Sequence, residues 1–443
     1  MNTCYSIKFI HQLNWHDLPI EAQHQAKRCL LDTLGVAVAS RKTDLSRIVY
    51  DFATTMYSGA DCHLWLDGRG VSPAGAALAH GISIDALDIH DNCNQVKGHA
   101  GVALIPTALA IMEQQGNISG QELLTAIVVG YEIAIRAGLA LHQSACDYHS
   151  SGAWNALGCA AIASRLLGLN FEQTQHALGI AEYHGPRSQM MRCIDYPTML
   201  KDGSGWGAMT GISAAWLAQG GFTGAPALSM EADDLATVWA DMGKRWYICE
   251  QDFKRYAVCH WAQPAIAASL HLIEIHNLLP KHIQRIQVFT FFEATRLHNR
   301  CPQNTEQAQY SLPFPVAAAV FHNHLGIEEL SGVSLHDEQI LDLADRVELI
   351  EDADCNATFP ERQMARVCIN TYDGRSLNSD MTLAPWDSLG IPATDEELSE
   401  KFNWLVEPSL GKITGTLKRY IWQLDQYNDA NKLLTFLNSP SMR

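Results

Sequence analysis

The sequence lacks the signatures of several large enzyme classes. It contains no G-x-x-x-x-G-K-[ST], G-x-S-x-G or H-E-x-x-H motif, which excludes a P-loop, an α/β-hydrolase nucleophile elbow and a zincin-type helix. The glycines of residues 203–207 partly imitate a dinucleotide-binding loop. However, residues 190–200 before them do not have the pattern of a β-strand, which disfavours a Rossmann fold.

Charge is also scarce in this chain. Only 18% of the 443 residues are charged, against 47% that are hydrophobic, and the net charge is −17. A nucleic-acid partner requires a positive field, so we expect no nucleic acid. The composition is that of a folded globular protein, and the small charged fraction favours a partner chain that covers part of the surface.

Long apolar runs and closely spaced cysteine pairs are absent as well. No stretch reaches 18 uncharged apolar residues, which predicts no transmembrane helix and no membrane partner. Residues 1–8 have no basic region followed by an apolar run, so we expect no secretory signal and a cytoplasmic location. The 12 cysteines form no C-x-x-C pair, and Cys29, Cys159 and Cys368 lie in apolar runs. We therefore expect buried, reduced thiols.

The first half of the chain contains a series of helices rich in small residues. Apolar residues recur at helical spacing, and an S-x-x-E capping box at Ser119 precedes one of the runs. The predicted helices cover residues 23–39, 71–81, 105–114, 123–141, 151–167, 171–181 and 206–217. Gly207 and Gly211 lie four residues apart in the last of them and would let two helices approach closely. We therefore expect a tightly packed helical bundle.

The pattern changes after about residue 264. Residues 283–292 are rich in β-formers, residues 365–371 alternate, and Asp373-Gly374 is typical of a hairpin turn. A helix is expected at 315–321, and helical spacing returns over 398–437. We predict a mainly α protein with a large all-helical domain made of residues 1–264 and 396–443, and an inserted smaller α+β domain made of residues 265–395.

One segment concentrates reactive side chains. Residues 85–99 hold three aspartates, two histidines and one lysine between two apolar helices. Acid, base and cation groups gathered in this way are typical of an active-site loop, with a solvated loop as the plainer alternative. The 19 histidines of the chain also suggest metal binding, for which Asp88, His90 and Asp91 could supply ligands. Because no second well-spaced cluster accompanies them, we expect no metal ion.

Six landmarks in order along the chain resemble the MmgE/PrpD family of 2-methylcitrate dehydratases, cis-aconitate decarboxylases and iminodisuccinate epimerases. They are L-D-T-L-G at 31–35, D-I-H-D-N at 88–92 with G-H at 98–99, Y-H at 148–149, L-K at 200–201, F-K-R-Y at 253–256 with Cys259 and Pro264, and Y-S-L-P-F at 310–314. The resemblance extends from about residue 20 to residue 435. It implies a cofactor-free enzyme, a homodimer and an α+β lid inserted into a helical domain.

The resemblance also implies a set of active-site positions. They are Asp88, Asn92, His99, His149, Lys201, Lys254 and Phe314. Three positions depart from the family pattern: Asn92 replaces a threonine, Ala100 replaces a proline and Phe314 replaces a lid tyrosine. The loop also gains His90 and Lys97. These changes weaken the case for methylcitrate and cis-aconitate as substrates and leave the two matched histidines and two matched lysines intact.

The residue types suggest a division of roles. His99 and His149 form the expected acid/base pair, because an imidazole titrates near neutrality. Lys201 and Lys254 would bind a carboxylate and stabilise enolate-like charge, and Asp88 would orient or charge a histidine. Plainer alternatives are a helix cap for His149, a surface position for Lys201 and an ordinary basic pair for Lys254. The candidates for substrate binding are Asn92, Lys97, His90, Asp91, Arg187, Arg192 and Phe314, with structural ion pairs as the alternative for the two arginines.

These residues favour a cofactor-independent lyase that dehydrates a hydroxy di- or tricarboxylate by removing a proton next to a carboxylate. An epimerase with two opposed bases, or a decarboxylase acting on a related carboxylic acid, is the main alternative. A metal-dependent or non-catalytic relative is less favoured. The expected partners are a small carboxylic-acid substrate and a second copy of the chain.

Overall fold

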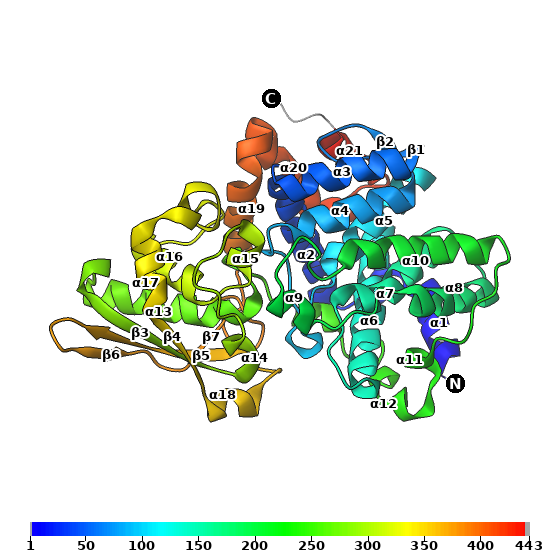
Figure 1. Cartoon of the computed structure of the whole chain (residues 1–443). Helices are drawn as coiled ribbons and strands as arrows, with labels where there is room; N and C mark the ends of the chain where they lie inside the picture. The colour runs from blue at the N-terminus through cyan, green and yellow to red at the C-terminus, as the bar shows by residue number, and fades with distance from the viewer. Residues whose placement is uncertain (1, 439–443) are drawn as a thin grey trace.

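The computed structural model describes residues 2–438 and contains two differently built parts (Figure 1). The part on the right of Figure 1 consists of packed helices, and the part on the left is built around a five-stranded sheet. The fold is therefore mainly α with small sheets, which confirms the predicted class. The predicted division at residues 264 and 396 stays a prediction.

The helices of the first part follow the predicted order. Their bounds are α1 (Asn2–Gln12), α2 (Ile20–Ser40), α3 (Asp44–Met56), α4 (Pro73–Asp85), α5 (Gly101–Gln115), α6 (Gly120–Ser144), α7 (Ser151–Leu166), α8 (Phe171–His184), α9 (Met191–Asp195), α10 (Ser204–Gln219), α11 (Leu228–Glu231) and α12 (Ala236–Trp239). Local signals set several starts. The Ser119 side chain accepts a hydrogen bond from the Glu122 amide at 3.1 Å and caps α6, as its sequence predicts.

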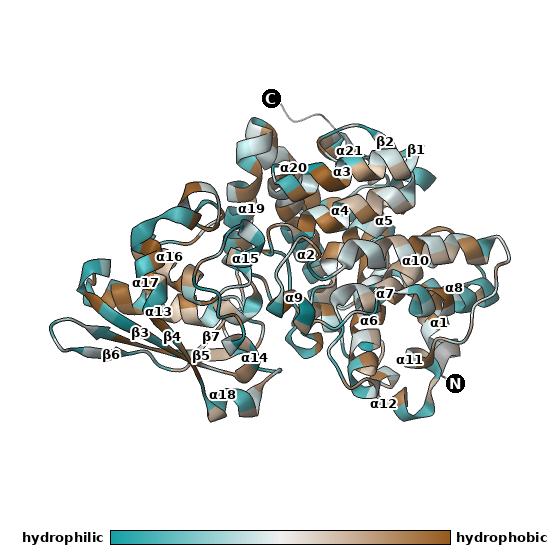
Figure 2. Ribbon diagram, in the orientation of Figure 1, coloured by the Kyte–Doolittle hydropathy of each residue, from teal (hydrophilic) through white to brown (hydrophobic). Residues whose placement is uncertain are grey.

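Small residues bring these helices unusually close together. Helix α10 packs against both α4 and α7, and Figure 2 shows all three as largely pale ribbon, because Ala, Gly and Ser prevail in them. A Cβ on Gly207 would lie 2.4 Å from the Gly152 oxygen, and one on Gly211 would lie 2.4 Å from the Cys159 Cβ. The predicted close approach at these two glycines is confirmed.

One expectation needs correction. The helical part is not all-helical, because strands β1 (Ser58–His63) and β2 (Gly70–Val71) form an antiparallel pair. Gly70 permits this pairing, since a Cβ there would lie 2.5 Å from the Gly59 oxygen.

Helix α6 is long and apolar enough, by length and composition alone, to cross a membrane. However, 94% of its apolar window is buried within the fold, as in the central helix of a bundle.

The second part carries the sheet and its own helices. Its elements are α13 (Gln263–His276), β3 (Ile283–Thr290), α14 (Phe292–Thr295), α15 (Thr305–Gln309), α16 (Pro313–His322), α17 (Glu338–Asp345), β4 (Val347–Glu351), α18 (Ala353–Thr358), β5 (Met364–Thr371), β6 (Ser376–Asn378) and β7 (Thr382–Leu383). The strand order is β4-β3-β5-β6, with β7 also paired to β5. The β5–β6 hairpin pairs Asn370 with Ser376 around Gly374, whose φ is +88°, which confirms the predicted turn.

The chain then returns to the first part. Helices α19 (Asp395–Leu410), α20 (Thr414–Trp422) and α21 (Lys432–Leu437) follow the sheet, and Figure 1 shows α19 and α20 in orange beside the blue α2. The buried Lys401 of α19 donates hydrogen bonds at 2.6 Å to Asp32 Oδ1 of α2 and to the Ile89 oxygen. The C-terminal helices therefore support the segment that sequence reasoning identified as the active-site loop.

Candidate active site

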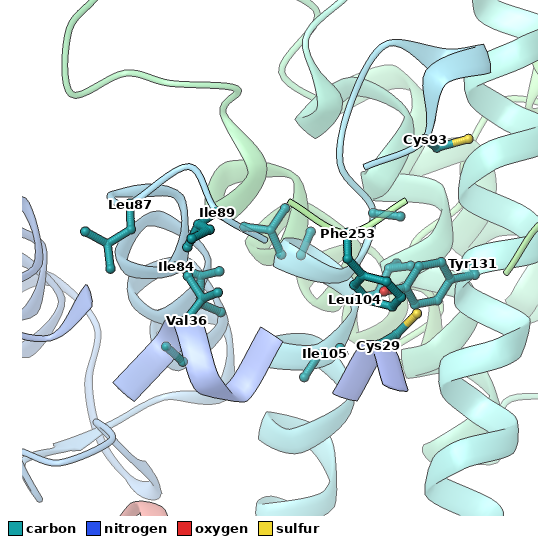
Figure 3. Close-up of a cluster of buried hydrophobic side chains, with 14 of the residues drawn as sticks. Cys29, Val36, Ile84, Leu87, Ile89, Cys93, Leu104, Ile105, Tyr131 and Phe253 are labelled. Carbon is teal, nitrogen blue, oxygen red and sulfur yellow. The ribbon is translucent and has the colours of Figure 1, made fainter. Parts of the chain in front are cut away.

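The loop between α4 and α5 is anchored by apolar side chains on both sides of its polar residues. Leu87 and Ile89 are buried in the core, and Figure 3 shows Ile89 beside Ile84 of α4. Phe253 is buried as well and lies beside Tyr131 and Cys29 in the same view. Because the residues next to Asp88 and Lys254 are fixed in the core, the two polar side chains are held in one place.

Asp88 and Lys254 form the centre of the site. The Lys254 ammonium is completely buried and donates to the Asp88 carboxylate and, at 3.0 Å, to the Asp88 backbone oxygen. Asp88 has a left-handed φ of +48°, a conformation that is uncommon for residues other than glycine, asparagine and aspartate. Its Oδ2 atom is buried and has no hydrogen-bond partner among the described residues. The sequence predicts Asp88 beside a histidine and Lys254 as a carboxylate-binding cation, and the structure pairs these two residues with each other; the catalytic role of each stays a prediction.

His99 lies against this pair in a defined tautomer. Its Nδ1 atom is 2.7 Å from the Asp91 backbone oxygen, which can only accept, so Nδ1 carries the proton. The Nε2 atom is 3.8 Å from Asp88 Oδ1. Burial, and then the charge of Lys254, lower the pKa of His99 well below its usual value. His99 is therefore neutral at neutral pH, with the lone pair of Nε2 directed toward the carboxylates, as a base requires.

A second carboxyl group faces His99 and was missed by sequence reasoning. Asp202 Oδ2 lies 3.9 Å from His99 Nε2 and accepts a 2.8 Å hydrogen bond from the Ser151 hydroxyl. The same Ser151 oxygen accepts the His99 amide at 3.0 Å. Burial, and then the charges of Asp85 and Asp88, raise the pKa of Asp202 to about 6. Asp202 can therefore hold a proton close to neutral pH, and its place directly after Lys201 was the available signal.

His90 and Asp91 support His99 from behind. The His90 ring meets the His99 ring edge-on, with centroids 4.6 Å apart, and its Nε2 lies 3.1 Å from Asp85 Oδ1. Asp91 accepts hydrogen bonds from the Tyr131 hydroxyl at 2.6 Å and the Gly101 amide at 3.3 Å. Burial raises the pKa of Asp91 to about 6. These contacts fit positioning residues, and the predicted role in substrate binding stays a prediction.

The α+β part contacts the site at Lys201 of the helical part. This residue is buried, has a φ of +47°, and donates to the Gln309 side chain. Its ammonium lies 4.9 Å from the centre of the Tyr310 ring. Gln309 in turn donates to the Ala86 oxygen at 3.0 Å, which ties the lid to the loop before Asp88. Phe314 is completely buried in the apolar core, and its predicted role in substrate binding stays a prediction.

Asn92 fastens the loop to the segment that carries Lys254. Its backbone pairs with that of Asp252 through hydrogen bonds of 2.9 and 2.8 Å, and its side chain donates to Asn94 Oδ1 at 2.8 Å. His260 lies in the same region and was not among the predicted residues. Its Nδ1 is 2.7 Å from Gln363 Oε1, and burial lowers its pKa to about 4.

Buried Lys97 and partly exposed His149 lie near Tyr148 and His142. The Lys97 ammonium lies 4.3 Å from the centre of the Tyr148 ring, and burial lowers its pKa. The His149 amide donates to His142 Nε2 at 3.1 Å. Within residues 2–438, no hydrogen bond, ion pair or ring contact joins His149 or Lys97 to His99. The described residues thus show no direct contact between the two histidines that the sequence predicts as a pair, although Ser151, two residues after His149, accepts a hydrogen bond from the His99 amide, and the catalytic role of His149 stays a prediction.

Arg187 and Arg192 are exposed on the helical part. Arg192 donates to the Ser188 hydroxyl at 3.4 Å. In the described part of the chain neither arginine forms an ion pair, so the alternative reading of the two as structural ion-pair partners is wrong. Their predicted role as a carboxylate clamp stays a prediction. Among the described residues, no three His, Cys, Asp or Glu side chains are close enough to hold a metal ion.

Comparisons with known proteins agree with this geometry. The family model for the MmgE/PrpD N-terminal domain matches residues 7–244, and the model for the C-terminal domain matches residues 256–423. Among curated proteins, a cis-aconitate decarboxylase of Homo sapiens is 27% identical, over 98% of this chain and 93% of its own length. Cis-aconitate decarboxylases of Mus musculus and Aspergillus terreus are 24% and 22% identical, over 98% and 96% of this chain and 93% of their own lengths.

Proposed function

The chain belongs to the MmgE/PrpD family of enzymes, and from that premise we propose that it is a lyase acting on a small di- or tricarboxylic acid. Decarboxylation of cis-aconitate, or of a close analogue, is the first reaction to test, because relatives that span almost the whole chain are named for it. The observation that carries the proposal is the position of His99, whose free Nε2 atom faces two buried carboxyl groups beside a buried lysine.

Decarboxylation needs a cation and an acid in a site that excludes water. The bond between a substrate carbon and its carboxylate breaks, carbon dioxide leaves, and the electron pair is delocalised through the neighbouring double bond toward another carboxylate as enolate-like charge. Lys201 and Lys254 are buried cations that can stabilise this charge. A proton must then reach the carbon. Asp202, with a pKa of about 6, can supply it directly or through His99 Nε2.

Dehydration of a hydroxy di- or tricarboxylate is the second candidate, and the neutral state of the His99 imidazole favours it. A neutral imidazole can remove the proton next to a carboxylate, and protonated Asp202 can then donate to the departing hydroxyl, which leaves as water. The charge that forms between the two steps is again enolate-like. The same groups therefore serve both reactions, and the substrate decides which bond breaks.

The proposal is tested by incubating the purified chain with a panel of carboxylic acids in deuterated water and following the products by NMR. A decarboxylase releases carbon dioxide and places one deuterium on the product, either on the carbon that lost the carboxylate or, where a double bond delocalises the charge as in cis-aconitate, on the carbon next to a remaining carboxylate. A dehydratase produces a new alkene that absorbs in the ultraviolet, and an epimerase exchanges the α-proton without net change in absorbance. His99→Ala should abolish the reaction, whereas the surface change Arg285→Gln should not. No turnover of any di- or tricarboxylate would overturn the proposal.

We also propose that the chain forms a homodimer, as the family resemblance and the small charged fraction suggest. Sedimentation equilibrium at micromolar concentration should give about twice the mass of one chain. A mass equal to one chain would contradict this. The cytoplasmic location and the absence of cofactors, nucleic acid and membrane partners stay predictions.

A further inference from the structure

Two cavities lie near the buried cluster, and they differ in which residue of the cluster their lining approaches. One, of about 720 Å³, is lined by Leu87, next to Asp88 in the chain, and by Met199, two residues before Lys201. The other, of about 680 Å³, lies between residues 194–198 of the helical part and residues 296–301 of the lid, and is lined by Tyr310. Either could be the route by which a substrate reaches the site.

The charges of the two cavities are opposite. The first is lined by the carboxylates of Asp44, Glu306, Glu328 and Glu329, with Lys42 and the imidazole of His324 as its basic groups. Among the described residues that line the second, Asp195 is the one acid, whereas Arg296 and Arg300 are permanent cations and His298 is an exposed imidazole. A di- or tricarboxylate is repelled by the first cavity and attracted by the second.

We propose that the second cavity is the vestibule through which the anionic substrate is captured. This inference rests on the proposed function, because it assumes a polycarboxylate substrate. The vestibule matters here because the chain carries a net charge of −17, so its overall field opposes the approach of an anion. A local cluster of cations must overcome that field, and cationic clefts raise the rate of capture for anions.

Tyr310 separates the vestibule from the catalytic cluster. Its ring lines the cavity on one side and lies 4.9 Å from the Lys201 ammonium. Only 4% of Tyr310 is exposed, so it forms the inner wall of the vestibule. A carboxylate held by the arginines is therefore separated from the first buried lysine by this one aromatic ring. Movement of this ring would open the path to Lys201.

The ion pair between Asp195 and Arg296 crosses the vestibule from the helical part to the lid. Arg296 Nε donates to Asp195 Oδ1 at 3.0 Å, and about a third of each side chain is exposed. Asp195 thus neutralises one of the cations that would attract the substrate. A role in substrate capture predicts opposite changes in kcat/KM when Asp195 and Arg296 are each neutralised. A purely structural role predicts a loss of activity in both variants.

The test compares kcat/KM of two variants on the substrate found above. Asp195→Asn removes the competing negative charge and should raise kcat/KM about 3- to 10-fold, and Arg296→Gln should lower it by a similar factor. Raising the ionic strength from about 0.01 M to 0.15 M should shrink both effects. Arg285→Gln is the matched control, because its charge lies on β3 away from the cavity, and it should change kcat/KM less than twofold. If both vestibule variants lose activity together, the ion pair is structural and the inference is wrong.

A binding measurement separates this inference from the proposed reaction. Tricarballylate is a saturated tricarboxylate with no double bond or hydroxyl group to react, and calorimetry can follow its binding to the full chain. Asp195→Asn should tighten this binding and Arg296→Gln should weaken it, each about 3- to 10-fold, even if no turnover is ever found. Equal affinity in both variants and the wild type would overturn the vestibule while leaving the proposed function intact.

Discussion

Two buried lysines hold neighbouring peptide groups of the same loop. Lys254 donates to the Asp88 carboxylate and to the Asp88 backbone oxygen. Lys401, from the other end of the chain, donates to the Asp32 carboxylate and to the Ile89 backbone oxygen. Each lysine therefore neutralises one buried aspartate and satisfies one buried carbonyl. As hydrogen-bonded units the two pairs are equivalent.

The surroundings of the two aspartates are different. Asp88 lies 3.8 Å from the free nitrogen of His99, whereas Asp32 lies within α2 and fastens it to α19. A buried ion pair adds little net stability compared with well-packed apolar residues, but loss of one partner is costly because the other charge stays buried. The comparison teaches that the proposed catalytic pair, Asp88–Lys254, is distinguished by the histidine beside it, and that burial and pairing alone do not identify it.

The largest expected effect comes from the histidine that distinguishes the pairs. His99→Ala should lower kcat by about 10²- to 10⁴-fold while the chain stays folded, because a general acid or base is lost. Steady-state kinetics together with circular dichroism would check this. Turnover close to that of the wild type would show that Asp88–Lys254 is as structural as Asp32–Lys401.

Chemical rescue provides the control for that variant. His99 is only 7% exposed, so added imidazole should not restore the activity of His99→Ala. His149 is partly exposed, and His149→Ala, also expected to lose about 10²-fold in kcat, should be rescued by imidazole in part. Rescue of both variants would contradict the contrast between a buried and an accessible histidine.

Loss of the catalytic lysine should be next in size. Lys254→Met removes the cation beside Asp88 and should lower kcat about 10²- to 10³-fold, as the loss of one donor to developing negative charge does. The variant should also lose about 3–5 kcal/mol of stability, because Asp88 stays buried without its partner. Kinetics on the folded fraction, with urea unfolding alongside, separates the two effects.

The matching change in the other pair should affect stability without a comparable effect on turnover. Lys401→Met should lose about 3–5 kcal/mol of stability for the same reason, while kcat of the folded protein stays within about threefold of the wild type. If Lys401→Met does not fold, the double variant Asp32→Asn/Lys401→Met removes both charges and should recover most of the loss. A fall in kcat as large as that of Lys254→Met would remove the distinction between the pairs.

The comparison also shows what the sequence could predict. The helices were predictable because apolar spacing and caps are local signals, as at Ser119. The loop of residues 85–99 was predictable from its composition. The placing of Lys254 and Asp88 in one site followed from the resemblance to a known family, whereas their direct contact across 166 residues was not predicted.

Contacts between distant segments left no such signal. Lys401 reaches Asp32 across 369 residues, and Asp202 reaches His99 through Ser151, which lies 51 residues before it. Neither contact has a local pattern, because each depends on how whole helices pack. The lack of a direct contact between His149 and His99 in the described residues has the same cause. The two histidines belong to consecutive motifs of the family, but the order of motifs along a sequence does not determine where each side chain points.

The smallest expected effect concerns a third buried aspartate, which has no lysine. Where the other two aspartates have a lysine, Asp252 has His260, whose Nε2 atom lies 3.9 Å from the Asp252 carboxylate. This histidine is neutral because burial lowers its pKa to about 4. Burial, and then the charge of Asp387, raise the pKa of Asp252 to about 7. The folded chain thus holds this proton more tightly than the unfolded chain, where an aspartate titrates near pH 3.9.

The stability due to Asp252 is therefore fully present below about pH 4 and is lost as the pH rises through about 7. Thermal unfolding between pH 5.5 and 8.5 should show Tm falling from pH 5.5 to about pH 7 and levelling off above it, where Asp252 is ionised in both the folded and the unfolded chain. Asp252→Asn cannot ionise, keeps an acceptor for the Ser388 amide, and should remove a few degrees of that fall. The surface change Asp234→Asn is the control and should leave the profile unchanged. If Asp252→Asn follows the wild-type profile, Asp252 is ionised throughout this range. A buried aspartate in this fold could then keep its charge without a lysine as its partner.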